Sequence, residues 1–192
     1  MNGFSPTIPV GLLWTLARWA MPPRVEFGSP VQRQKKESTC HYHVPIKLCP
    51  RFKIGPGTMP NCRIFLDRYS GDIVSESIRL CWGDACFSEI SERENLYKDE
   101  MFLVPIAWRE EEKNDGNAYI TDTRYFKNEG EKVHALTPDR SKHRFKLRVK
   151  SGKYERASPH FYLLRVPVGV SNGHFTVEIE YEGEGTRGMS TT

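Results

Sequence analysis

The feature of this 192-residue chain that most constrains its fold is a strict alternation of apolar and polar residues. It is clearest from Cys40 to Asp67, CHYHVPIKLCPRFKIGPGTMPNCRIFLD. Two alternating apolar sets lie on either side of a Gly/Pro-rich break: Tyr42, Val44, Ile46 and Leu48, then Cys62, Ile64 and Leu66. A period of two residues is typical of half-buried β-strands. This stretch therefore predicts a strand, a turn and a second strand.

The same pattern recurs along the chain between turn signals, and no long helix is expected. Further strands are expected at 24–27, 78–82, 101–108, 118–126, 144–150, 161–168 and 175–181. Seven to nine short strands separated by turns are typical of an antiparallel β-sandwich of the immunoglobulin-like kind. We assign residues 24–182 to this domain, residues 1–23 to an apolar extension and residues 183–192 to a disordered tail.

The segments between the expected strands, and one proline within a strand, carry further predictions. The polar run at 32–39, QRQKKEST, predicts a linker or loop. The charged stretch at 88–100 predicts a loop or a single helical turn, and 83–100 and the Gly/Pro loop at 55–60 are candidate contact regions. Pro45 lies inside an expected strand and predicts an edge position, because proline cannot donate a hydrogen bond to a neighbouring strand.

The N-terminal extension contains an apolar segment, Ile8–Met21, IPVGLLWTLARWAM. It is shorter than the ~20 apolar residues that a membrane-spanning helix needs, and it lacks the basic start of a signal peptide. One hypothesis is a short helix in a membrane interface, ended by Pro22–Pro23. Its contact residues would be Leu12, Leu13, Trp14, Leu16 and Trp19. The alternative is a segment that packs on the domain or is partly disordered.

A basic stripe on one expected strand is the most pointed functional feature. In RFKLRVK at 144–150, the apolar residues Phe145, Leu147 and Val149 point one way. The opposite face carries Lys142, Arg144, Lys146, Arg148 and Lys150. These five cations extend over about 27 Å at about 3.3 Å per residue, and could contact phosphates or anionic lipid headgroups. Alternatively, they pair with the acidic residues Glu178, Glu180 and Glu182, if that strand is a neighbour.

Composition and cysteine content predict no cofactor or metal. The net charge of +4 and pI near 8.8 are too small by themselves to predict nucleic-acid binding. The five cysteines cannot all pair within the chain, and we expect reduced thiols packed like small hydrophobic residues. Their spacing matches no zinc motif. His41 and His43 share a strand face, where we expect an ordinary surface pair rather than metal ligands.

No nucleophile, phosphate-binding or calcium motif is recognisable, so we expect a protein that is not an enzyme. The function expected is a non-catalytic binding module with a protein partner. One alternative is a peripheral membrane-surface protein anchored by residues 8–21; a second is an enzyme whose site is assembled across loops. Nucleic acid is not an expected partner, and we expect the chain in the cytoplasm or associated with a membrane.

The order of strand patterns resembles a known group. The strings HYHVPIKLCPR, NCRIFLD, IRLCW, MFLVPIAW and HRFKLRVKSG follow one another with a tyrosine-bearing strand before the last. This order, over about residues 24–182, resembles that of uncharacterised prokaryotic proteins with an immunoglobulin-like β-sandwich and an N-terminal hydrophobic segment. The resemblance implies that fold. It carries no assigned activity and therefore no site residues.

Overall fold

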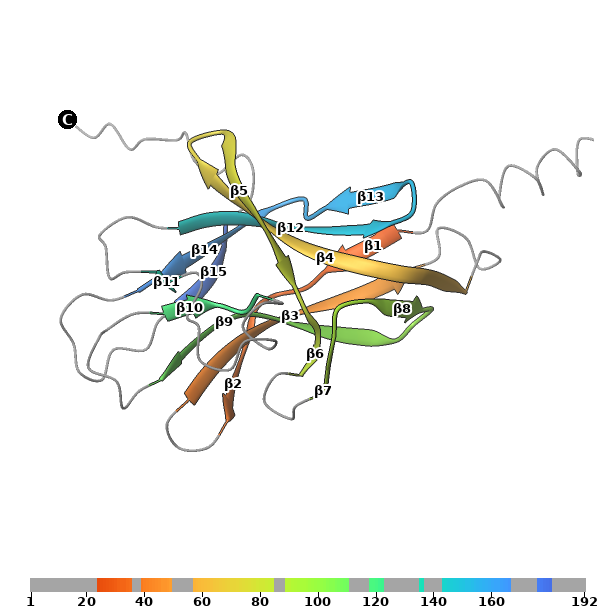
Figure 1. Cartoon of the computed structure of the whole chain (residues 1–192), viewed down its shortest axis with the longest axis horizontal. Helices are drawn as coiled ribbons and strands as arrows, with labels where there is room; N and C mark the ends of the chain where they lie inside the picture. Colours follow the sequence, from red (N-terminus) through yellow and green to blue (C-terminus); the bar gives the residue numbers. More distant parts are fainter. Residues whose placement is uncertain are drawn as a thin grey trace, which may run out of the picture.

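Two antiparallel β-sheets make up the fold in the computed structural model (Figure 1). The structure describes residues 24–35, 39–49, 57–84, 89–110, 118–122, 135–136, 143–166 and 176–180. In these ranges the regular elements are all strands, which confirms the predicted all-β sandwich. The expected membrane-contact residues at 12–19, the expected tail at 183–192 and Lys142 lie outside the described ranges.

The first sheet has the order β1-β3-β9-β10-β11, with β2 also paired to β3. Its strands are β1 (Arg24–Phe27), β2 (Val31–Lys35), β3 (Thr39–Cys49), β9 (Met101–Glu110), β10 (Ala118–Ile120) and β11 (Ala135–Leu136). Both β1 and β2 lie along the same edge of β3, one after the other.

The second sheet has the order β15-β14-β12-β4-β5. Its strands are β4 (Thr58–Ser70), β5 (Ile73–Leu80), β12 (His143–Ser151), β14 (Phe161–Arg165) and β15 (Thr176–Glu180), with β8 (Glu94–Tyr97) beside β4 and β13 (Tyr154–Ala157) beside β12. The short strands β6 (Trp82–Asp84) and β7 (Glu89–Ser91) pair with each other.

The core is built from the alternating residues that the sequence pattern indicated. Val44, Ile46 and Leu48 on β3 are fully buried, as are Leu147 and Val149 on β12. They belong to one cluster with buried residues of β4, β9 and β14. Because successive side chains point to opposite faces of a strand, the residues between them form the outer faces.

Pro45 is not at an edge, contrary to prediction, because β3 has neighbours on both sides. The neighbouring chain is interrupted beside it: β1 ends at Phe27 and β2 begins at Val31. The Pro45 carbonyl accepts a hydrogen bond from the Gly28 N–H at 2.8 Å. In an antiparallel pair the N–H and C=O of one residue face the same neighbour, so the missing donor faces this interruption.

Two segments predicted as loops contain strands. Residues 31–35, in the run expected to be a linker, form β2 along β3. Residues 89–91 and 94–97 form β7 and β8, where a loop or helical turn was expected. Neither segment alternates clearly in sequence. Their strand conformation is determined by pairing to β3, β6 and β4.

Candidate functional site

The outer face of β12 carries the predicted basic residues Arg144, Lys146, Arg148 and Lys150. The register with β4 places Lys146 opposite Asp67 and Arg148 opposite Phe65. Since Phe145, Leu147 and Val149 are buried in the core, the four cations lie on the opposite side of the second sheet, away from the core. We call this side of the sheet, formed by β4, β5, β12, β13, β14 and β15, the outer face of the second sheet.

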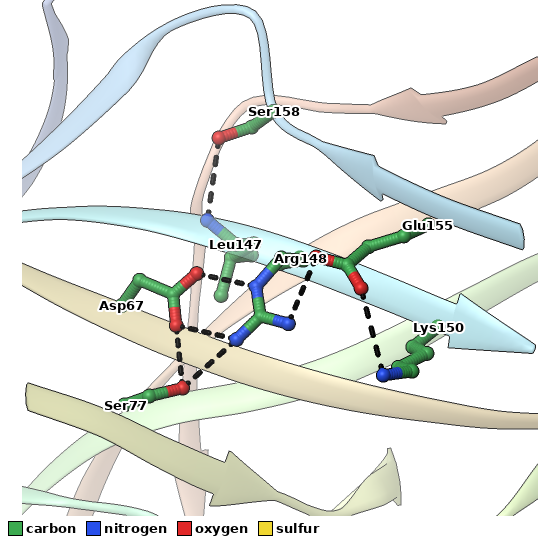
Figure 2. A network of polar contacts seen from close by, with 7 residues as sticks. All are labelled: Asp67, Ser77, Leu147, Arg148, Lys150, Glu155 and Ser158. Carbon is green, nitrogen blue, oxygen red and sulfur yellow. Dashed lines mark hydrogen bonds and ion pairs between the residues drawn. The ribbon is translucent and has the colours of Figure 1, made fainter. Parts of the chain in front are cut away.

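Arg148 is at the centre of a polar network on this face (Figure 2). Its Nε and Nη2 donate to the two carboxylate oxygens of Asp67 at 2.6 and 2.9 Å. Nη2 also donates to the Ser77 hydroxyl at 3.0 Å, and that hydroxyl donates to Asp67 at 2.6 Å. Nη1 donates to Glu155 at 3.1 Å. These hydrogen bonds, led by those to Asp67, raise the pKa of the Arg148 guanidinium.

Two further cations lie against an aromatic ring from the adjacent strand. The guanidinium carbon of Arg144 is 4.0 Å from the centroid of the Phe161 ring, and Lys146 Nζ is 4.4 Å from it. Tyr69 meets the same ring edge-on, with centroids 5.0 Å apart. A cation over an aromatic face is attracted by the ring quadrupole. The arrangement holds both long side chains in defined positions.

The aromatic residues of this face were not predicted from the sequence. Phe145, on β12 itself, was predicted to face away from the cations, and its ring is buried in the core. Phe161 comes from β14, and Phe65, 4.8 Å from the Arg148 guanidinium, comes from β4. The sequence does contain apolar residues at the outer positions of FYLLR, at 161–165. That these residues lie beside the basic stripe can be known only from the strand order.

The basic stripe and the acidic strand are not neighbours, although one ion pair joins them. Within the second sheet β14 separates β12 from β15, so the two stripes are not adjacent. Arg144 still reaches Glu180 across β14, at 2.8 Å, whereas Glu178 pairs with Arg165 at 3.1 Å. The other described carboxylates near the cations come from β4 and β13: Asp67 binds Arg148, and Glu155 lies 3.7 Å from Lys150.

His41 and His43 are not surface residues, contrary to expectation. They are 6% and 0% exposed. The register places His41 opposite Trp108 and Trp108 opposite Tyr119, on the outer face of the first sheet. The His41 ring stacks on Trp108 at 6.3 Å, and Trp108 lies 4.9 Å from Tyr119. Across the described part of the chain, no three His, Cys, Asp or Glu side chains gather as metal ligands.

The cysteine side chains that the structure describes include one fully buried thiol, Cys62. Its Sγ donates to the Met59 carbonyl at 3.1 Å. Burial raises its pKa to about 11, so the thiol is protonated at neutral pH and is a poor nucleophile. This side chain acts as a small core residue.

His160 makes the stability of the fold depend on pH. Burial, reinforced by the positive charge of Lys146, lowers the pKa of its imidazole below the ordinary 6.5. Its ring lies edge-on to Tyr162 at 4.8 Å. The unfolded chain therefore binds the proton more tightly than the folded chain, and stability present above pH 6.5 is lost as the pH falls through 6.5 toward the folded pKa.

We expect His160→Gln to reduce this loss. The measurement is urea unfolding of both proteins at several pH values from neutral to mildly acidic. Since His41 and His43 are also buried, the informative quantity is the difference between the two pH profiles. Parallel profiles would contradict a contribution from His160.

The fold and the site define the class of this protein as an antiparallel β-sandwich with a structured, charged outer face. Comparison with protein-family models, with curated proteins and with solved structures found no match. In the ranges that the structure describes, no helix has the length and apolar character needed to cross a membrane.

Proposed function

We propose that this chain is a non-catalytic binding module that recognises a protein partner through the outer face of the second sheet. One observation carries the proposal: Arg144 and Lys146 share the Phe161 ring at 4.0 and 4.4 Å. Beside them, Arg148 is held by both oxygens of Asp67. Side chains already ordered before binding lose less conformational entropy on association. Arginine and aromatic residues also dominate the energetics of protein interfaces.

The charge arrangement favours a protein over a polyanion. Arg148 is bound by Asp67 and Glu155, and Arg144 lies beside Glu180. A phosphate would have to compete with these carboxylates for the same N–H donors. A protein partner can present both signs of charge, and complementary patterns of this kind give specificity. The predicted kinship with immunoglobulin-like domains is part of the proposal, since such sandwiches commonly act as binding modules, through their loops and edges.

Charge reversal at Lys146 tests the proposal. Affinity purification with the wild-type protein as bait should recover a specific protein, and Lys146→Glu should lose it. The matched control is Lys153→Glu, which makes the same charge change at an exposed residue of the β12–β13 turn. Binding of the recovered protein, once purified, should weaken about 10-fold or more for Lys146→Glu, the effect of roughly 1.4 kcal/mol at an interface.

Three results would contradict the proposal. The first is equal recovery of partners by Lys146→Glu and the wild type. The second is salt-sensitive retention on heparin that Lys146→Glu abolishes, without a protein partner, which would identify a polyanion site. The third is turnover of a substrate by the purified chain, which would identify an enzyme.

A further inference from the structure

Two cations lie directly opposite each other at one end of the outer face of the second sheet. The register pairs Arg63 of β4 with Lys150 of β12. Because Cys62, Ile64 and Val149 beside them are buried in the core, both charged side chains lie on the outer face. Like charges directly opposite each other destabilise a sheet. We call Arg63 and Lys150 the opposed cation pair, and by itself this pair does not stabilise the fold.

The carboxylates on this part of the face are already bound by another cation. Both oxygens of Asp67 accept hydrogen bonds from Arg148. Glu155 accepts one from Arg148 at 3.1 Å, and its other oxygen lies 3.7 Å from Lys150 Nζ (Figure 2). Among the residues that the structure describes, no carboxylate is within ion-pair distance of Arg63, and its side chain makes no hydrogen bond. The opposed cation pair is therefore only partly compensated.

The charges around the opposed cation pair leave an excess of one positive charge. Three cations face two carboxylates: Arg63, Arg148 and Lys150 with Asp67 and Glu155. Arg79 of β5, on the other side of β4, is paired separately with Glu92 at 2.9 Å. One carboxylate from outside the chain would neutralise the excess. A phosphate group, with a charge of about −1.5 to −2 at neutral pH, would exceed it.

We propose that the protein partner places the carboxylate of an aspartate or glutamate between Arg63 and Lys150. The inference rests on the proposed function, because it assigns the partner's chemistry at the same outer face. Lys150 is four residues from Lys146 on β12, about 13 Å, so both can lie in one interface. Hydrogen bonds from a guanidinium or ammonium group to a carboxylate are short and strong. The bound carboxylate would replace the repulsion between the two cations by two attractive contacts.

An NMR titration of the full chain with sodium acetate tests this inference without a partner. The signal followed is the Nε–Hε resonance of Arg63. We expect acetate to shift it more than sodium chloride does at the same ionic strength, and Lys150→Gln to raise the acetate concentration needed for half of the shift. The matched control is Lys47→Gln on the first sheet, which should leave that concentration unchanged. Lys47 is similarly exposed and also lies 3.7 Å from one carboxylate.

Binding of the partner recovered by the wild-type bait is the second measurement. Arg63→Gln should weaken it about 10-fold, the effect of losing one hydrogen bond to a charged group. Arg24→Gln removes an exposed guanidinium from the first sheet and should not change it. The urea midpoint of Arg63→Gln should equal or exceed that of the wild type, because a like charge is removed. A midpoint well below it would contradict the repulsion between the two cations.

Three results would overturn the inference. One is a shift of the Arg63 resonance that is no larger with acetate than with chloride. A second is a shift that inorganic phosphate produces at lower concentration than acetate, which would identify a phosphate site. A third is equal binding of the partner by Arg63→Gln and the wild type.

The same measurements separate this inference from the proposed function. If Lys146→Glu loses the partner and Arg63→Gln retains it fully, the proposed function stands and the carboxylate contact is wrong. If acetate binds at the opposed cation pair but Lys146→Glu retains the partner, the carboxylate site is supported and the proposed function is contradicted.

Discussion

Replacing Trp82 by alanine should lower the free energy of unfolding by about 4 kcal/mol, within the range of about 3–5 kcal/mol for truncating a buried tryptophan. The side chain is fully buried. Its Nε1 donates to the Cys62 carbonyl on β4 at 2.9 Å, and its ring meets Phe102 of β9 edge-on at 6.3 Å. Trp82 therefore connects the two sheets, and its removal leaves a cavity between them.

Guanidinium unfolding measures the effect, with Trp82→Phe as the matched variant. Phenylalanine keeps most of the packing with Phe102 but leaves the Cys62 carbonyl without this donor, which we expect to cost about 1–3 kcal/mol. A loss below about 1 kcal/mol for Trp82→Ala would show that the ring is not a core contact between the sheets. Equal losses for the two variants would assign the effect to the hydrogen bond instead of the packing.

Replacing Asp67 by alanine should destabilise the protein by about 3 kcal/mol, because it leaves a largely buried arginine without its main carboxylate. The side chain of Asp67 is 7% exposed and that of Arg148 is 21% exposed. Two N–H donors of Arg148 and the Ser77 hydroxyl would lose their shared acceptor. The loss reflects the desolvation of a charge that is no longer compensated.

Two comparisons separate this explanation from a general loss of charge. Asp67→Ala combined with Arg148→Met should be more stable than Asp67→Ala alone, because the unpaired cation is removed as well. Glu155→Ala removes a carboxylate from the same guanidinium, but its side chain is 46% exposed, so we expect a loss of at most about 1 kcal/mol. A double variant no more stable than Asp67→Ala would contradict the mechanism.

Pairing between strands determined the surroundings of several residues, which the local alternation of residues could not predict. The alternation of Phe145, Leu147 and Val149 correctly predicted which face of β12 is buried. In contrast, the prediction that Pro45 lies at an edge was wrong, because the neighbouring chain is interrupted beside it between β1 and β2, 15 residues or more away in sequence. His41 and His43 were predicted to be surface residues, but the register places Trp108 and Tyr119 on the same face of the sheet.

The alternation of residues was enough to predict the all-β class, the inward and outward faces of the main strands and the position of the basic residues on one face of β12. The reason is that the two-residue period of a strand is a local property of the backbone. The contacts of Phe161 with Arg144 and Lys146, and of Asp67 with Arg148, could not be predicted in this way. Those contacts depend on strand order and register, which arise from packing between segments far apart in the chain.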